Sequence, residues 1–287
     1  MNETNKSRGC ARFCDLHTHS YFSDGTATPE EIIDAATELG LGAVALTDHN
    51  TVGGLCRFLD YAEGKDIIAV PGVEVSCDTE YGEVHILGLG IRRESFPLLE
   101  GYLDVILKNK RESNGALIRA LQKDGYKIDE DELLRAAGSG TFNRAHVAEA
   151  LMRGGYVKTI GEAFDTLLKK GGKYYREPER IPALECIKYL RSLGARVILA
   201  HPLLNLTEDE LREFLPRAAE AGLLGIEVLY TKYGEGEVAL SYELADKHGL
   251  LYSGGSDYHG DRKPDTLLGR GYGDLFIPMN FYEEMKL

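Results

Sequence analysis

The stretch FCDLHTHSYFSDG, residues 13–25, decides the fold that we predict for this chain. It opens with a short β-prone run and leads directly into His17 and His19. Residues two apart on an extended strand point to the same face, so both imidazoles suit one metal ion. Asp24 follows within the next turn and adds a carboxylate. The stretch therefore predicts a strand that ends in a metal-binding loop.

Six further apolar runs of strand length follow, and most of them also end in polar residues. Helical patterns separate many of these runs, which predicts βα units, a parallel sheet and a barrel-like α/β fold with seven strands. The carboxyl ends of barrel strands meet on one face, so we expect their polar residues to share one pocket. The predicted strands cover residues 12–16, 43–47, 67–70, 84–89, 196–200, 225–229 and 250–253.

Histidines and carboxylates gather at these strand ends and form the candidate metal centre. A lone histidine there is usually an ordinary polar residue, but six of the eight histidines lie in this set. Nine candidates exceed the four ligands of one tetrahedral zinc, so we expect two or three ions of Mn, Zn or Fe, with Glu74 as a bridge. The candidates are His17, His19, Asp24, His49, Glu74, His85, His201, Asp257 and His259.

The alternation of apolar strand-length runs with helical patterns ends at about residue 98. From there to about residue 175 the sequence shows helical periodicity alone. This stretch is too long for a loop inside a compact domain. We predict a first barrel part at residues 10–98, a helical insertion at 99–176 that covers the substrate, and a second barrel part at 177–287.

Composition limits the partners that we expect. The 287 residues contain 33 Lys and Arg against 46 Asp and Glu, a net charge of −13, which disfavours a grip on long nucleic acid. No apolar run reaches the roughly 20 residues of a membrane span. Five scattered cysteines, an odd number, and the lack of a signal-peptide pattern favour the cytoplasm. The oligomeric state stays open.

The ordered motifs resemble those of the PHP (polymerase and histidinol phosphatase) family. That resemblance implies a distorted TIM-like (β/α)7 barrel, a di- or trinuclear metal centre and phosphoester hydrolysis. The insertion resembles a bacterial single-domain subgroup with 3′,5′-nucleoside bisphosphate phosphatases, short-RNA 5′-exonucleases and a cyclic-phosphate dihydrolase. The matching motifs are His17-Thr18-His19, Ser23-Asp24-Gly25, Thr47-Asp48-His49, Gly72-Val73-Glu74, His85, Ala200-His201-Pro202 and Ser256-Asp257-Tyr258-His259.

The same resemblance distributes the metal ligands. It implies a first metal on His17, His19, Glu74 and Asp257, a second on Glu74, His85 and His201, and a third on Asp24, His49 and His259. Asp48, beside His49, would orient an imidazole.

For substrate contact, the resemblance points to Arg144 and Arg176, and we add His146 and Lys173 from the same two motifs. The sequence departs from the family pattern at Ala145, where proline is expected, and at Lys173, where a small residue is common. These departures leave the substrate open.

We expect a metal-bridging hydroxide to attack a phosphate ester of a small nucleotide-like substrate, such as a 3′,5′-bisphosphonucleoside or the 5′ end of a short RNA. His201, Glu74 and Asp257 are the predicted catalytic residues. Either His201 or metal coordination alone would assist the leaving group. The alternatives are a cyclic-phosphate or sugar-phosphate hydrolase, including one for histidinol phosphate, an amidohydrolase acting on C–N bonds, and a noncatalytic metal-binding module.

Overall fold

The computed structural model describes residues 13–137 and 142–287. Residues 10–12, with which the predicted first barrel part begins, therefore lie outside the described residues.

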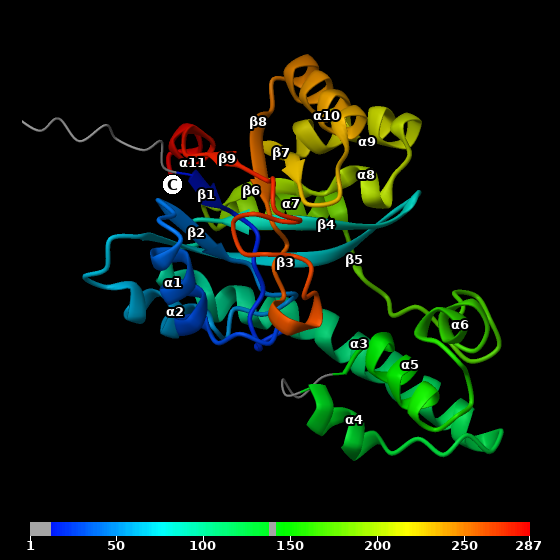
Figure 1. Cartoon of the computed structure of the whole chain (residues 1–287). Helices are drawn as coiled ribbons and strands as arrows, with labels where there is room; N and C mark the ends of the chain where they lie inside the picture. The colour runs from blue at the N-terminus through cyan, green and yellow to red at the C-terminus, as the bar shows by residue number, and fades with distance from the viewer. Residues whose placement is uncertain (1–12, 138–141) are drawn as a thin grey trace, which may run out of the picture.

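Strands from across the chain build one nearly closed, barrel-shaped sheet (Figure 1). Its order is β8-β7-β6-β4-β3-β2-β1-β9, and β5 pairs with β3 beside this path. Each of the seven predicted strands has a counterpart in this sheet, which confirms the barrel-like α/β fold. The strands of the described residues are β1 (Phe13–Asp15), β2 (Ala43–Leu46), β3 (Ile68–Thr79), β4 (Gly82–Leu89), β5 (Ile181–Pro182), β6 (Arg196–Ala200), β7 (Gly225–Tyr230), β8 (Leu251–Gly255) and β9 (Ile277–Pro278).

The prediction of a parallel sheet was wrong for β4, which runs antiparallel to both β3 and β6. Only Glu80 and Tyr81 connect β3 to β4, and so short a turn joins antiparallel strands, whereas a parallel pair needs a long crossover. Because β4 is reversed, its first residues lie beside the carboxyl ends of its neighbours. His85, near the start of β4, therefore pairs with Ala200 at the end of β6.

The sheet closes where the ends of β1 and β8 meet. The backbone N–H of Leu16 donates to the Gly254 carbonyl at 3.2 Å, and that of Asp257 donates to the His17 carbonyl at 2.9 Å. The buried carboxylate of Asp15 accepts hydrogen bonds from the Ser256 hydroxyl and from the backbone N–H of Ser256. These bonds place His17 and Asp257 side by side, although 240 positions separate them in the sequence.

Helices cover the outside of the barrel, with α1 and α2 at one side and α9 and α10 at another (Figure 1). The helices of the described residues are α1 (Pro29–Glu38), α2 (Leu55–Ala62), α3 (Phe96–Lys123), α4 (Glu130–Ala137), α5 (Arg144–Arg153), α6 (Ile160–Asp165), α7 (Ala183–Ser192), α8 (Pro202–Asn205), α9 (Glu208–Ala221), α10 (Glu235–His248) and α11 (Asn280–Met285).

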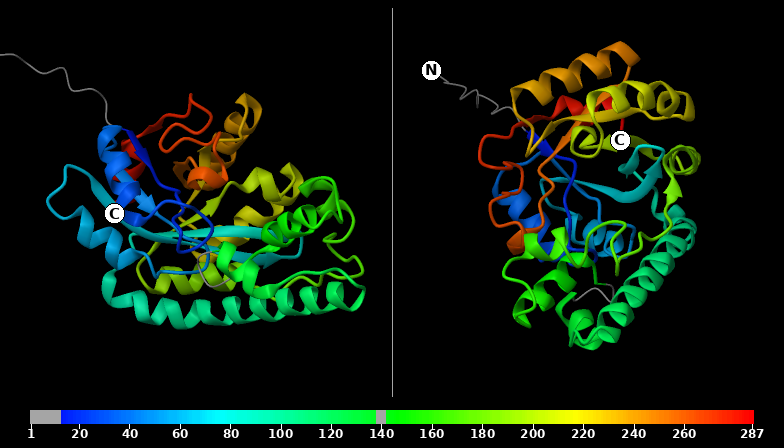
Figure 2. Two further views of the ribbon diagram at one scale, coloured as in Figure 1. Left: turned by 60° about the horizontal axis from the view of Figure 1, so that its bottom comes forward. Right: turned by 90° about the vertical axis from the view of Figure 1, so that its right-hand side faces the viewer.

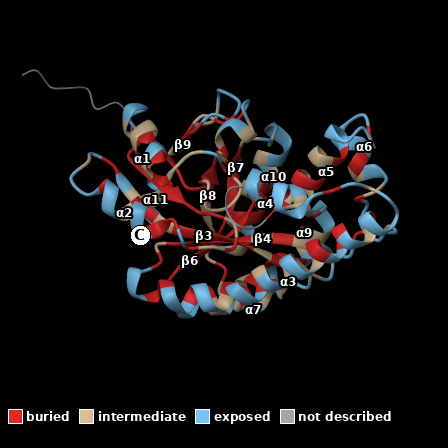
Figure 3. Ribbon diagram, turned by 90° about the horizontal axis from the view of Figure 1, so that it is seen from below, coloured by how far each residue is buried: buried red, intermediate tan, exposed pale blue. Residues whose placement is uncertain are grey.

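The long helix α3 extends from the barrel to a lobe that contains α4, α5 and α6 (Figure 2). A cluster of buried apolar side chains, among them Leu117, Val147 and Leu168, forms the core of this lobe, and a larger cluster fills the barrel. The strands are mostly buried and the outer helix faces mostly exposed (Figure 3). The division into two barrel parts and a helical insertion at 99–176 stays a prediction.

Among the described residues, no helix combines the length and the apolar character that crossing a membrane requires.

We expect Gly255→Ala to destabilise the protein, because a Cβ at this position would lie 2.1 Å from the Cβ of His17. Overpacking of this kind costs about 1–3 kcal/mol. Gly101→Ala in α3 is the control, since its Cβ would meet no atom within 4 Å and should stabilise the helix by about 0.5–1 kcal/mol. Denaturant unfolding of both variants measures the difference, and equal stabilities would contradict the close approach.

Candidate metal centre

The structure brings together the side chains of all nine predicted metal ligands. His17 and His19 follow β1, His49 follows β2, His201 follows β6, and Asp257 and His259 follow β8. Glu74 and His85 lie within β3 and β4. Among the described residues, the nine predicted ligands form four overlapping groups. In each group the possible ligand atoms lie within 4.8 Å of one another. The groups are His19, Asp24, His49 and His259; His17, His19 and Asp257; His17, Glu74 and His201; and His49, Glu74 and His85.

Glu74 is the centre of this arrangement. It was expected just after the third strand but lies inside the longer β3, with its carboxylate fully buried. Oε1 is 2.7 Å from His85 Nδ1 and 3.0 Å from His201 Nε2. Oε2 is 3.2 Å from Nε2 of both His17 and His19, and 3.0 Å from His49 Nδ1. A carboxylate shared in this way is suited to bridge metal ions.

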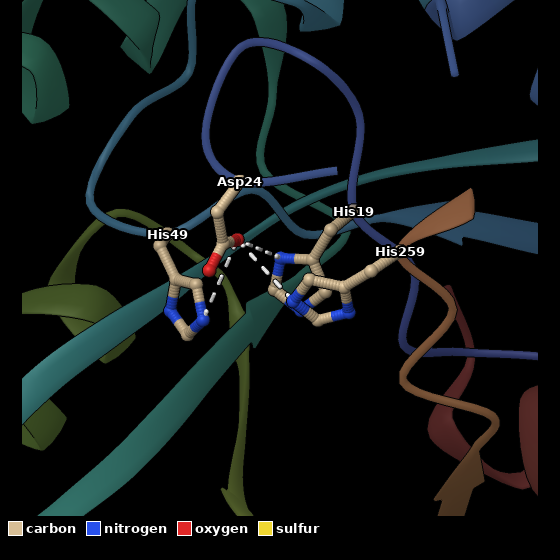
Figure 4. Close-up of side chains that lie close together, drawn as sticks. All are labelled: His19, Asp24, His49 and His259. Carbon is tan, nitrogen blue, oxygen red and sulfur yellow. Dashed lines mark ion pairs between the residues drawn. The ribbon is translucent and has the colours of Figure 1, made fainter. Parts of the chain in front are cut away.

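Asp24 forms a second focus of the site, where three imidazoles surround one carboxylate oxygen (Figure 4). Its Oδ1 is 3.2 Å from His259 Nε2, 3.9 Å from His49 Nε2 and 4.0 Å from His19 Nδ1. Whereas the side chains of His17 and His19 are fully buried, 24% of the Asp24 side chain is exposed. The site therefore opens toward solvent at Asp24.

Charge coupling shifts the pKa of most of these groups in the metal-free protein. Burial lowers the pKa of His19 and of His85, but nearby carboxylates outweigh it and raise these pKa values to about 9 and about 10. At His49 burial prevails, and the pKa falls to about 3. Burial raises the pKa of Asp24, Glu74 and Asp257, but the facing imidazoles hold each of them well below its ordinary value. The carboxylates are therefore ionised.

Several ligand-type atoms in the site have no hydrogen-bond partner among the described residues. They are Nδ1 of His19 and of His49, Oδ1 of Asp24 and Oε2 of Glu74, all buried. Buried polar atoms in folded proteins are normally satisfied, so these four require something further. Divalent cations would satisfy them, and a mixed nitrogen and oxygen donor set suits Mn, Zn or Fe. The residues thus fit a metal centre.

Asp48 forms hydrogen bonds with Ser20 and Ser23, which belong to the loop that contains Asp24. Its carboxylate accepts from the Ser20 backbone N–H at 2.8 Å and from the hydroxyls of Ser20 and Ser23 at 2.6 Å each. Within the described residues, this side chain therefore anchors the loop and makes no hydrogen bond to an imidazole. Its predicted action on a metal ligand stays a prediction.

The four predicted substrate residues lie in different surroundings. Arg144 lies over the ring of Tyr175, 4.3 Å from its centroid, and His146 Nε2 accepts a hydrogen bond from Arg262 at 2.6 Å. Arg176 donates to the Gly172 carbonyl at 2.6 Å, and the exposed Lys173 pairs with Asp124. None of the four joins the nine-residue cluster, and their contact with substrate stays a prediction.

Sequence reasoning missed several charged residues close to the site, among them Glu227, Lys110, Lys263 and Glu83. Glu227 in β7 contacts two predicted ligand residues, and its signal was a lone acidic residue inside the apolar run GIEVLY, 225–230. Lys110 lines a cavity together with Asp24 and His49. It lies among many charged residues of α3, so its sequence carried no distinguishing signal.

Comparisons with known proteins agree with this geometry. A family model described as PHP domain matches residues 15–177. A phosphoribosyl 1,2-cyclic phosphate 1,2-diphosphodiesterase from Eggerthella lenta is 32% identical over 86% of this chain and 94% of its own. A 3′,5′-nucleoside bisphosphate phosphatase from Chromobacterium violaceum is 31% identical over 85% of this chain and 86% of its own. A solved structure described as a metal-dependent phosphoesterase, from Bifidobacterium adolescentis, is 27% identical, covers 96% of both chains and has a TM-score of 0.81.

We expect metal binding near pH 7.5 to release protons, because a nitrogen must be deprotonated to bind a metal. With pKa values of about 9 and about 10, His19 and His85 are protonated there. Titration calorimetry in buffers of different ionisation enthalpy counts the protons released. Binding without proton release would contradict the raised pKa values.

The same shifts predict how the stability of the metal-free protein depends on pH. Both pKa values lie above the ordinary value of 6.5, so the stabilisation from His19 and His85 is complete below pH 6.5. It is lost as the pH rises through about 9 to 10. The melting temperature of metal-free protein across this range checks the sign.

Proposed function

The chain belongs to the PHP domain family and is a phosphoesterase, and we propose that it hydrolyses a phosphate ester of a small nucleotide-like molecule at a centre of two or three divalent cations. The observation that carries this proposal is the convergence of nine ligand-type side chains, four of whose buried atoms lack hydrogen-bond partners among the described residues.

We assign the ligands to three positions, of which the first two share Glu74. His17, His19, Glu74 and Asp257 would hold one cation, and Glu74, His85 and His201 a second. Asp24, His49 and His259 would hold the third, a set whose atoms lie within 4.8 Å of one another. The donor set suits Mn, Zn or Fe. When bound, the cations would activate water and neutralise charge on the phosphoryl oxygens.

The chain itself contributes cations beside this centre. Lys110 of α3 lines a cavity of about 260 Å³ that also contains Asp24 and His49. It lines a second cavity of about 140 Å³ together with Arg144 and Arg180. Lys110 and Asn143 belong to both linings, so both lie between the two cavities.

These basic residues differ in how far their charge is already compensated. Arg180 donates to Asp78 at 3.0 Å and to Glu83 at 2.8 Å, so its charge is neutralised within the protein. Within the described residues, Lys110 and Arg144 form no ion pair. Both side chains are half-buried, and a partly desolvated cation without a carboxylate partner favours an anionic ligand. Lys110 and Arg144 would therefore hold the phosphate-bearing part of the substrate that points away from the metals.

His201 is the side chain that we propose to act near the leaving group. Its Nε2 lies 3.0 Å from Glu74 Oε1, and its Nδ1 lies 3.0 Å from the Asn205 side-chain oxygen. These two contacts fix the orientation of the ring at the edge of the centre. Glu74 and Asp257 would act by holding the cations.

A cyclic-phosphate or sugar-phosphate hydrolase is the second candidate. It is favoured by the similarity to the Eggerthella lenta diphosphodiesterase, which is matched over nearly its whole length. The metal positions would serve either substrate class equally, so the difference has to lie in the cavities lined by Lys110.

We expect the Mn²⁺-loaded protein to hydrolyse 3′,5′-bisphosphonucleosides in a panel that also contains dinucleotides, cyclic phosphates, histidinol phosphate and amides. His17→Ala or Glu74→Ala should lower metal content and reduce this activity at least about 100-fold, because each removes a ligand. Metal analysis, circular dichroism and phosphate release measure the three effects.

His248→Ala is the matched control, since this histidine lies at the end of α10, outside the nine-residue cluster. Full activity in a metal-poor, folded variant would refute the metal centre. Turnover of histidinol phosphate alone would refute the substrate class.

We expect Lys110→Met to lower kcat/KM roughly 10- to 100-fold, which corresponds to a lost charged hydrogen bond of about 1.5–3 kcal/mol. Metal content should stay unchanged, because Lys110 is not a ligand. Lys158→Met, an exposed lysine between α5 and α6, is the control. An unchanged kcat/KM across the substrate panel would exclude Lys110 from the substrate site.

A further inference from the structure

None of the nine predicted metal ligands lies on strand β7. Two polar side chains of this strand nevertheless contact the candidate metal centre. Glu227 is fully buried, and only 3% of Tyr230 is exposed. Both contact residues that would bind metals, and neither belongs to the ligand set that the resemblance implies.

Glu227 connects ligand residues from two different strands. Its Oε1 lies 3.0 Å from His17 Nδ1, and its Oε2 accepts a 2.7 Å hydrogen bond from the backbone N–H of His201. With the His17 Nδ1 proton donated to Glu227, Nε2 of the same ring is left for a metal. That Nε2 faces Glu74 Oε2 at 3.2 Å. Glu227 thus sets both the tautomer and the direction of His17.

Tyr230 acts in the same way on Asp257. Its hydroxyl donates a 2.8 Å hydrogen bond to Asp257 Oδ2, which also accepts from Lys263 at 2.8 Å. The other oxygen, Oδ1, lies 3.3 Å from His19 Nε2 and 3.4 Å from His259 Nδ1. One carboxylate oxygen is therefore held by the protein while the other is directed to the metal positions.

A β-bulge lets both side chains face the site. Residues three apart on a regular strand point to opposite faces. The pairing of β7 with β8 shifts between Glu227, opposite Ser253, and Leu229, opposite Gly254. Val228 is therefore the extra residue of a bulge, and it brings Tyr230 to the same face as Glu227. Such irregularities are often found next to active sites, where they redirect a side chain.

We propose that β7 is the positioning strand of the metal centre, that is, the strand whose side chains orient metal ligands without binding metal. Its positioning residues, Glu227 and Tyr230, hold His17, His201 and Asp257 by hydrogen bonds to atoms that do not face the metal positions. This inference rests on the proposed metal-dependent function and deepens it. Residues that hold ligand side chains in this way typically contribute 10- to 100-fold to metal affinity. The bulge is the backbone feature that makes the double contact possible.

The test compares metal affinity in the full-length protein with and without these contacts. Glu227→Gln and Tyr230→Phe are titrated with Mn²⁺ and Zn²⁺ against a competing chelator, and the melting temperature of each metal-free variant is recorded. We expect affinity to fall roughly 10- to 100-fold in each variant. Tyr230→Phe changes no charge, so a loss there reflects positioning and not a weaker electrostatic field.

Tyr233→Phe is the matched control. Its hydroxyl accepts from the backbone N–H of Leu203 at 2.9 Å, and its ring packs beside Tyr230 with centroids 5.3 Å apart. Its hydroxyl makes no hydrogen bond to the nine-residue cluster within the described chain, so its metal affinity should equal that of the unaltered protein. A merely structural role for Tyr230 would lower the melting temperature of metal-free Tyr230→Phe without a change in its metal affinity.

Unchanged metal affinity in Tyr230→Phe and in Glu227→Gln would overturn the inference. If Glu227→Gln does not fold, Tyr230→Phe decides alone. The measurement uses no phosphoester, so a protein that binds metal but hydrolyses nothing in the panel would refute the proposed function and leave the positioning strand intact. Equal affinities with full phosphatase activity would refute the positioning strand alone.

Discussion

The buried carboxylate of Glu74 is the constraint on which the rest of the site depends. Five imidazoles lie within 3.2 Å of its two oxygens. An ionised carboxylate without partners is expensive to bury, so these imidazoles offset the desolvation. They also crowd one another, since Nε2 of His17 and of His19 are only 3.0 Å apart. Groups packed this closely favour the binding of divalent cations. Such cations would reduce the repulsion between the rings and would satisfy the buried oxygens that lack hydrogen-bond partners among the described residues.

Two departures from a regular barrel place the Glu74 carboxylate and its histidine neighbours. β3 continues beyond its pairing with β2, so Glu74 lies within a strand: β4 pairs with it on one side, and on the other its backbone hydrogen-bonds to Asp48 and Asn50, which follow β2. β4 returns in the opposite direction, which brings His85 within 2.7 Å of Glu74. The closure of β1 against β8 then supplies His17 and Asp257. All the predicted ligands except Asp24 thus lie on a strand or among the first few residues after one, where the backbone is well fixed.

The convergence of the nine candidate ligands was predictable from the sequence, because the strand ends of a barrel meet whatever lies between them. His17 and His19 were identifiable from their spacing, and the others from their place after apolar runs. The direction of β4 was missed because an apolar run reads the same in both directions. Glu227 was missed because it lies inside a strand, and only the register shift at Val228 and the neighbouring strands determine where a mid-strand side chain points. Lys110 depends on how α3 packs, which no local pattern encodes.

The acidic composition of the chain is compatible with phosphate chemistry, because the electrostatic field at the site depends on the charges nearest to it. The chain carries a net charge of −13, yet Lys110 lines the cavity of Asp24 and His49, Arg144 lines the neighbouring cavity, and neither forms an ion pair among the described residues. Three divalent cations would bring six positive charges to three ligand carboxylates, a local balance of about +3 when the imidazoles are neutral. Arg180 adds little, since Asp78 and Glu83 already neutralise it. An electrostatic field confined to a few side chains and the metals would suit a short anion, whereas a long polyanion would also meet the net negative charge of the chain.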